Sequence, residues 1–154
     1  MDIKITPYKA EYKQAFKTLN KRWIDKYFVM EEADYNALDN PESYIINKGG
    51  QILYALHNEI PVGVCALIKL VNHPYDYELA KMAVMPKYHG QGIGKKLAYA
   101  IIKAAKEAGG QTLFLESNTI LEPAIKLYRK IGFIELEKIE SPYERSNIHM
   151  VLKL

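Results

Sequence analysis

The segment Met82-Ala83-Val84-Met85-Pro86-Lys87-Tyr88-His89-Gly90-Gln91-Gly92-Ile93-Gly94 decides how this chain folds. It joins an apolar strand candidate, residues 75–85, to a glycine-rich turn and then to a helix that Gly109-Gly110 ends. The helix is predicted from one apolar face, formed by Ile93, Leu97, Ile101, Ala104 and Ala108. The first N–H groups of a helix lack internal partners and carry partial positive charge, so such a unit can hold a phosphate group.

Two familiar phosphate-binding motifs do not fit the turn. A P-loop would need glycine where His89 stands and serine or threonine where Lys96 stands. A dinucleotide fingerprint that starts at Gly90 would need glycine or alanine at Lys95. A glycine-rich turn without any ligand stays open on spacing alone.

The remaining elements are read outward from this turn. Before it, strand, helix and hairpin patterns follow one another; after it, strands alternate with a helix that starts near Pro123 and ends at Gly132. We predict one domain, 1–154, of the α/β (α+β) class, with a mixed, mostly antiparallel central sheet of about seven strands and helices on both faces. The predicted strands are residues 2–6, 51–57, 60–70, 75–85, 112–115, 133–139 and 147–154, with early helical segments around 12–23, 31–38 and 42–46.

Two blocks of this sequence resemble the GNAT superfamily of N-acetyltransferases. The turn is similar to the family pattern Gln/Arg-x-x-Gly-x-Gly/Ala, with His89 at its first position. Residues 124–133 resemble the second block, Ala-x-x-Leu-Tyr-x-x-x-Gly-Phe. The resemblance implies an acyltransferase that moves an acetyl group from acetyl-CoA, its cosubstrate, to a primary amine of a small molecule or peptide by direct attack in a ternary complex.

The resemblance also implies which residues bind the cosubstrate. The main chain of Met82, Ala83 and Val84 would pair with the pantetheine arm, and the Val84 N–H would point at the thioester carbonyl. The pyrophosphate would lie on the turn and first helical residues, and Asn118 would contact the arm because Leu121 stands where many members have asparagine. The implied turn residues are His89, Gly90, Gln91, Gly92, Ile93, Gly94 and Lys95.

Glu78 is the candidate general base. An alkylammonium has a pKa near ~10.4, so a carboxylate must take its proton, directly or through water. Strict strand alternation places Glu78 on the same face as Met82 and Val84. Glu116 is the alternative base, and a salt-bridged structural role for Glu78 stays open.

Tyr128 is the candidate acid near the sulfur. A phenol titrates near ~10 and a thiol near ~8.5, so full proton transfer to the thiolate is uphill by ~2 kcal/mol. We therefore expect a hydrogen bond from Tyr128 and a larger contribution from the Val84 amide. A purely structural aromatic role for Tyr128 is the competing interpretation.

Composition bounds the remaining function classes. The net charge of +3 is spread along 154 residues, and no apolar run approaches a membrane span of ~20 residues. We expect a cytoplasmic protein without nucleic-acid, membrane or metal partners; a homodimer rests on family analogy. Cys65 is expected in the core, whereas residues 141–145, Trp23, Tyr27 and Phe28 are either acceptor wall or ordinary surface and core.

Two other functions stay open at this point. One is a non-catalytic coenzyme A-binding module with the same fold. The other is a nucleotide hydrolase, which the failed P-loop spacing disfavours.

Overall fold

The structure, a computed structural model, describes residues 1–137 and 139–154. Every predicted element is present, with ends that differ by a few residues. The predicted strand 133–139 is shorter in the structure, and Lys138 lies outside the described residues. The strands are β1 Lys4–Pro7, β2 Gln51–His57, β3 Ile60–Lys69, β4 Tyr77–Val84, β5 Thr112–Ser117, β6 Ile134–Leu136 and β7 Ile148–Lys153, and the helices are α1 Lys13–Tyr27, α2 Glu32–Asp39, α3 Pro41–Tyr44, α4 Ile93–Glu107 and α5 Glu122–Ile131.

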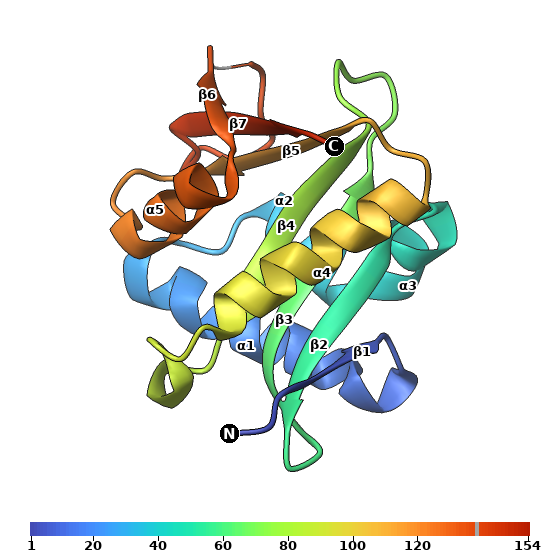
Figure 1. The fold of residues 1–154 in the computed structure, drawn as a ribbon, viewed down its shortest axis with the longest axis vertical. Helices are drawn as coiled ribbons and strands as arrows, with labels where there is room; N and C mark the ends of the chain where they lie inside the picture. Colours follow the sequence, from blue (N-terminus) through green and yellow to red (C-terminus); the bar gives the residue numbers. More distant parts are fainter. Residues whose placement is uncertain (138) are drawn as a thin grey trace.

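The strands form one seven-stranded sheet in the order β1-β2-β3-β4-β5-β7-β6 (Figure 1). β4 and β5 run parallel, and the other neighbouring pairs among the described residues are antiparallel. The parallel pair is joined through α4, as a crossover requires. The predicted fold class is confirmed.

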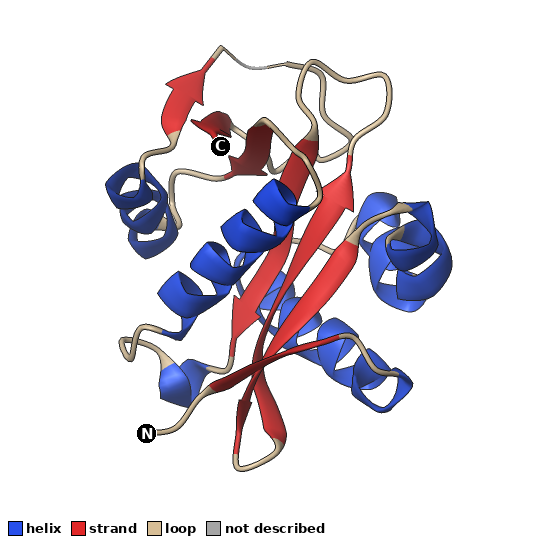
Figure 2. Cartoon of the chain, turned by 45° about the vertical axis from the view of Figure 1, so that its right-hand side comes forward, coloured by secondary structure: helices blue, strands red, loops and turns tan. Residues whose placement is uncertain are grey.

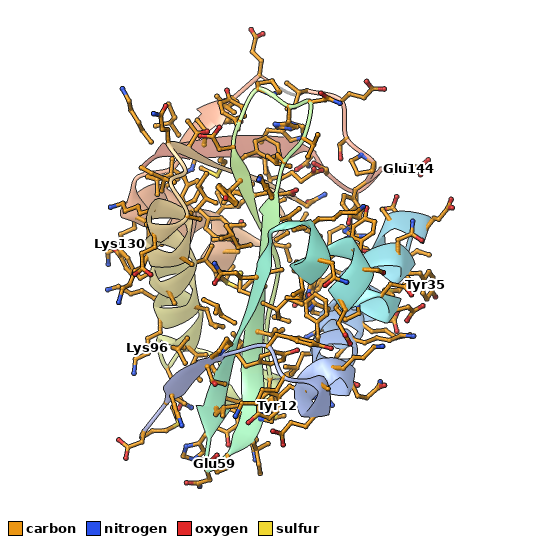
Figure 3. All side chains as sticks on the ribbon, turned by 90° about the vertical axis from the view of Figure 1, so that its right-hand side faces the viewer. Tyr12, Tyr35, Glu59, Lys96, Lys130 and Glu144 are labelled. Atoms are coloured by element: carbon orange, nitrogen blue, oxygen red, sulfur yellow. The ribbon has the colours of Figure 1, made fainter. Side chains whose placement is uncertain are left out.

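Helices cover both faces of the sheet. α4 crosses β2, β3 and β4 on one face, and α5 packs into the same apolar cluster (Figure 2). α1, α2 and α3 contribute to a second cluster on the other face. Figure 3 shows this division: Lys96 and Lys130 lie on the α4 and α5 side, while Tyr35 and Glu144 lie on the α2 side.

The α4 helix lies close to β3. A Cβ added at Gly63 would be 3.1 Å from side-chain carbons of both Ile93 and Leu97, so a glycine is needed for this approach. Ile93, Leu97 and Ile101 are fully buried as predicted, but Ala108 is exposed because the helix ends at Glu107. The described helices include none that is long and apolar enough to cross a bilayer.

β4 and β5 separate after a short paired stretch. They pair only at Tyr77 with Leu113 and at Glu78 with Phe114, yet β4 continues to Val84 and β5 to Ser117. The main chain of the later β4 residues is therefore open on the side where β5 would have paired. This opening lies beside the N-terminal end of α4 (Figure 1).

A β-bulge at Lys81 interrupts the alternation of β4. Lys81 has a φ of 54°, and the register with β3 shifts between Val64 and Ala66. Leu79 and Met82 consequently face the same α4-side cluster, although simple alternation would put them on opposite faces. Glu78 lies on the opposite, α1-side face, which overturns the expectation that it shares a face with Met82 and Val84.

Candidate active site

A cavity of about 700 Å³ occupies the opening between β4 and β5; we call it the splay groove. Its walls come from both strands, the N-terminal end of α4 and the facing side of α5. The groove brings together ten of the residues predicted to bind the cosubstrate or to act on it: Met82, Ala83, Val84, His89, Gly90, Gly92, Ile93, Gly94, Lys95 and Tyr128.

The glycine turn is shaped for close approach to its backbone. Gly90 and Gly92 have φ values of 78° and 79°, a left-handed conformation in which a side chain is strained. The first helical bond runs from the Lys96 N–H to the Gly92 carbonyl at 3.1 Å. The N–H groups of the preceding helical residues, 93–95, therefore have no partner within the helix. With no acidic residue in the first turn, this end of α4 suits a diphosphate.

His89 ties the turn back to β4. Its Nε2–H donates to the Val84 carbonyl at 2.8 Å. The neighbouring Met85 N–H donates to the Val62 carbonyl on β3 at 2.8 Å, so alternation directs the Val84 N–H and carbonyl away from β3 and toward the splay groove. Because the His89 imidazole occupies the Val84 carbonyl, the Val84 N–H is the main-chain group of that residue that can bind a ligand.

Two of the implied cosubstrate residues do not line the splay groove. Gln91 has its Nε2 near the Lys87 carbonyl, at 3.5 Å. Asn118 donates to the Arg145 carbonyl at 2.8 Å and accepts from the Ile120 N–H at 2.9 Å. Its amide is thus used to hold two loops together, and its contact to a pantetheine arm stays a prediction.

A second cavity of about 290 Å³, here called the side pocket, adjoins the splay groove. Glu78 lines the side pocket only, whereas Glu116 lines both cavities. Trp23 lines both as well, Tyr27 lines the groove and Phe28 lines the side pocket. Trp23 and Phe28 also pack against the α1-side cluster, whereas the predicted core position of Tyr27 is wrong, because its side chain is exposed. The two cavities also share Ala80, Lys81, Ser117 and Leu121.

Glu78 is in an environment that favours its neutral form. Burial, followed by the charge of Glu116, raises the pKa of Glu78 from its ordinary value of 4.5 to about 8, and the charge of Lys81 partly opposes this. Glu116 is held in place by the Ser141 hydroxyl, which donates to it. The pKa of Glu78 is thus suited to a group that must exchange a proton near neutral pH.

A buried ionic cluster forms the wall beside the bulge. The carboxylate of Asp34 is fully buried and binds Lys81 Nζ at 2.5 Å and both terminal nitrogens of Arg145 at 2.6 Å. It also accepts the Glu31 N–H at 2.9 Å as part of the α2 capping box. Burial disfavours the charged form of Asp34, but the Arg145 hydrogen bonds and the charge of Lys81 outweigh it and lower the pKa of Asp34 from 3.8 to about 2.

Sequence reasoning singled out Arg145 but missed Asp34 and Lys81. Arg145 belongs to the segment 141–145, which the sequence offers as acceptor wall or surface; in the structure its guanidinium lies against Asp34, Glu31 and the Tyr143 ring. Glu31 and Asp34 lack the usual Ser or Thr signature of a capping box, and nothing in the sequence indicated that Asp34 has a partner 111 residues away.

Tyr128 lies on α5 with its ring packed against Phe133, at a centroid distance of 5.7 Å. The side chain is buried and lines the splay groove. Burial, with a smaller contribution from Cys65, raises the pKa of Tyr128 above its ordinary value. The phenol is consequently a hydrogen-bond donor that keeps its proton.

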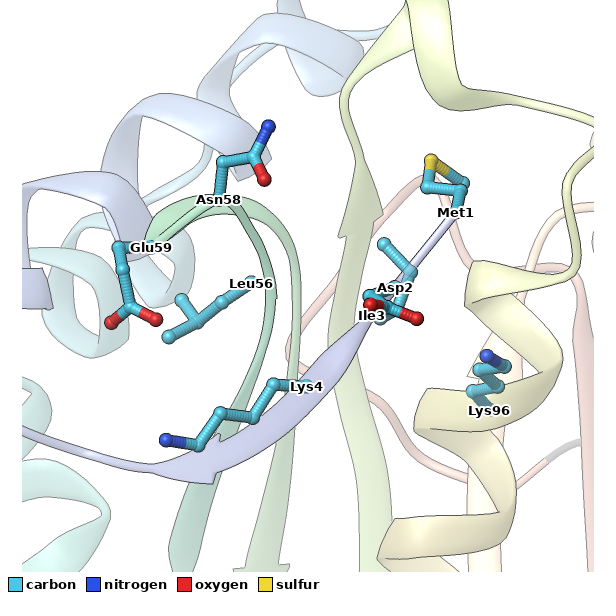
Figure 4. A pocket seen from close by; sticks show the side chains of 8 residues that line it. All are labelled: Met1, Asp2, Ile3, Lys4, Leu56, Asn58, Glu59 and Lys96. Atoms are coloured by element: carbon cyan, nitrogen blue, oxygen red, sulfur yellow. The ribbon is translucent and has the colours of Figure 1, made fainter.

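Two other features lie outside this site. Cys65 is fully buried, as predicted, and burial raises the pKa of its thiol. A cavity of about 410 Å³ near the N-terminus contains none of the predicted site residues; Figure 4 shows Lys4, Glu59 and Lys96 coming from separate elements around it. Among residues 1–137 and 139–154 there is no cluster of three metal-ligating side chains.

Comparison with known proteins identifies the family. Residues 10–133 match the acetyltransferase (GNAT) family, and the chain belongs to it. It is 38% identical over 60 residues to the uncharacterized N-acetyltransferase YjgM of Escherichia coli, a stretch that spans 39% of this chain and 36% of that relative. The chain thus matches about a third of that relative's length.

Solved structures match over nearly the whole chain. A GNAT-family acetyltransferase from Staphylococcus aureus Mu50 has a TM-score of 0.88 at 26% identity, over 99% of both chains. The putative acetyltransferase YncA of Salmonella typhimurium, solved with acetyl-CoA, has a TM-score of 0.77 at 17% identity, over 99% of this chain and 94% of that one. The second likeness concerns the fold alone.

Proposed function

We propose that this protein transfers an acetyl group from acetyl-CoA to a primary amine in a ternary complex. The observation that carries the proposal is the splay of β4 and β5, which puts open main-chain groups of β4 between the N-terminal end of α4 and the carboxyl groups of the side pocket. The binding of acetyl-CoA by YncA is consistent with this use of the fold.

The splay groove is the proposed cosubstrate site. The amides at the start of α4 would hold the diphosphate, with Lys95 adding positive charge. The open edge of β4 at Met82 and Val84 would pair with the amide-containing arm as an added strand does. Acetyl-CoA supplies the thioester; the chain supplies binding, orientation and proton handling.

The side pocket is the proposed acceptor site, with Glu78 as the general base. The pKa of Glu78, raised to about 8, lies near neutral pH, so the carboxylate can take up a proton from the amine and release it again. Glu116 lies at the junction of the two cavities, so it would hold the incoming ammonium group next to the reacting centre. Proton removal through a water between the two carboxyl groups is compatible with this arrangement.

The Val84 N–H is the proposed donor to the developing oxyanion. It points into the splay groove, and a preorganised donor of this kind is typically worth ~2.7–4 kcal/mol. Tyr128 would donate a hydrogen bond to the leaving thiolate without giving up its proton, because burial raises the pKa of the phenol. Positioning therefore contributes more than proton transfer from Tyr128.

Two measurements test the proposal together. Titration calorimetry with coenzyme A should give saturable binding to the folded protein, and a free-thiol assay with acetyl-CoA and an amine panel should give amine-dependent release. Saturable binding without release from any amine would favour the non-catalytic module. Absence of binding would reject the proposal.

A further inference from the structure

Both cations beside the side pocket are already paired. Lys81 Nζ lies 2.5 Å from Asp34, and Arg145 binds the same carboxylate at 2.6 Å and Glu31 at 3.3 Å. Two acidic side chains thus balance two basic ones. A negatively charged ligand group in the pocket would have to break this buried cluster to gain a cationic partner.

The third basic side chain at the pocket is also unsuited to an anion. His73 accepts the Tyr75 N–H on its Nδ1 at 3.1 Å, and burial lowers the pKa of its ring. Both features favour neutral imidazole. Among the described residues that line the side pocket, no basic group is therefore free to pair with a ligand carboxylate.

The carboxyl groups of the side pocket, unlike its cations, have no ion-pair partner in the part of the chain that the structure describes. Glu78, Glu116 and Glu140 line the pocket, and none of them forms an ion pair among residues 1–137 and 139–154. Glu116 accepts one hydrogen bond from the Ser141 hydroxyl, which does not neutralise it. A positively charged ligand group is thus favoured at this end of the pocket, whereas a ligand carboxylate would be repelled by the charge of Glu116.

The rest of the side pocket is built largely from rings and aliphatic groups. Trp23 and Phe28 meet edge to face at a centroid distance of 6.3 Å, and Tyr44, Phe114, Ile68 and Leu70 add apolar surface. The face of Tyr143 is taken by Lys81 at 4.4 Å and Arg145 at 4.6 Å. A cavity of about 290 Å³ with such walls suits a compact apolar body.

We propose that the acceptor is a small primary amine with an apolar, preferentially aromatic body and no acidic group. This inference rests on the proposed function and names its substrate class. The ammonium end lies at Glu78 and Glu116, and the body lies against Trp23, Phe28 and Phe114. Free amino acids, which carry a carboxylate next to the amine, are poor acceptors.

Matched amine pairs test this class directly. Phenethylamine and phenylalanine share the amine and the ring and differ by the carboxylate, as pentylamine and norleucine do with an aliphatic body. We expect the amine of each pair to exceed the amino acid at least about tenfold in kcat/KM for thiol release. Comparable or better use of the amino acids would overturn the inference and leave acetyl transfer standing.

Binding separates the inference from the proposed function. Calorimetric titration of the same four compounds into the coenzyme A complex should show the same preference, whether or not transfer occurs. Selective amine binding without turnover would reject the proposed transfer and keep the acceptor class. If neither phenethylamine nor pentylamine binds or reacts at millimolar concentration, the acceptor class is wrong.

A charge variant adds a second readout. Glu116→Gln removes the like charge, so the ratio of phenethylamine to phenylalanine use should fall at least about threefold even if both rates drop. Glu107→Gln, an exposed change at the far end of α4, should leave the ratio unchanged. An unchanged ratio in Glu116→Gln would contradict the assigned role of this carboxylate.

Discussion

Glu78 shows how one bulge changes what a side chain can do. On an unbroken β4 it would point with Met82 and Val84 toward the α4 face, away from the side pocket. The extra residue at Lys81 turns it to the α1 face, where burial and Glu116 raise its pKa to about 8. Its role as base is therefore tied to a pH range that can be measured.

Activity should rise with pH through the titration of Glu78. A base acts when ionised, so the ratio of wild-type to Glu78→Gln kcat/KM should increase up to about pH 8 and then level off. Taking the ratio with one amine removes the amine's own titration from the profile. We expect the variant to lose roughly 10²–10⁴-fold in kcat at the plateau, with coenzyme A binding intact. A ratio that stays flat from about pH 6 to about pH 9 would show that Glu78 is not the general base. Glu116, the alternative base, would then be tested in the same way with Glu116→Gln.

At the scale of elements, the glycines that flank α4 allow a matched comparison. Gly92 and Gly109 have φ values of 79° and 85°, and an added Cβ would meet nothing within 4 Å at either. Alanine at each position should cost ~1–2 kcal/mol of unfolding free energy through backbone strain. Gly92 borders the splay groove and Gly109 does not.

Gly92→Ala should therefore weaken coenzyme A binding at least about tenfold by calorimetry, because the Cβ and the shifted amides disturb the diphosphate site. Gly109→Ala should lose similar stability in urea unfolding and keep the wild-type affinity. Equal affinities for the two variants would show that the start of α4 does not bind the diphosphate.

The elements themselves were predictable because their signals are local. Apolar periodicity, Pro86, Pro123 and the glycine turns mark strand and helix ends in the sequence. The bulge at Lys81 was not predictable, since no local pattern marks it and the side chain of Lys81 binds Asp34, which is 47 residues away in the sequence. The same holds for Asn118, whose amide is engaged by residues on two loops.

At the scale of the whole molecule, Asp34 links three distant segments. It joins the start of α2, the β4 bulge and the loop before β7 through Lys81 and Arg145. The candidate catalytic residues could be named from local motifs, but the walls that select a ligand depend on this long-range cluster. Removing the Asp34 carboxylate should therefore lower the unfolding free energy and change the shape of the side pocket.

Asp34→Asn should lower the unfolding free energy by about 3–5 kcal/mol, because it leaves the buried Lys81 without a counter-charge and Arg145 with Glu31 alone. Asp39→Asn is the matched control: its partner Lys17 is partly exposed, and the loss should stay below about 1 kcal/mol. Urea unfolding at pH 7 measures both. Similar losses in the two variants would show that the cluster contributes no more than a surface pair.

Stability should also depend on pH through Glu78, with a sign opposite to that of Asp34. Asp34 has a pKa of about 2 in the folded protein against an ordinary 3.8, so its contribution is present above 3.8 and is lost as pH falls toward 2. Glu78 has a folded pKa of about 8 against an ordinary 4.5, so the folded chain holds a proton that the unfolded chain releases between these values. Its contribution is complete below pH 4.5 and declines as pH rises to about 8. The wild type should therefore lose roughly 2–4 kcal/mol relative to Glu78→Gln across this window, and the difference should be constant above it. If the unfolding free energies of the two proteins run parallel from about pH 5 to about pH 8, Glu78 is ionised at neutral pH as an exposed carboxylate would be. The side pocket would then be more polar than its aromatic lining indicates.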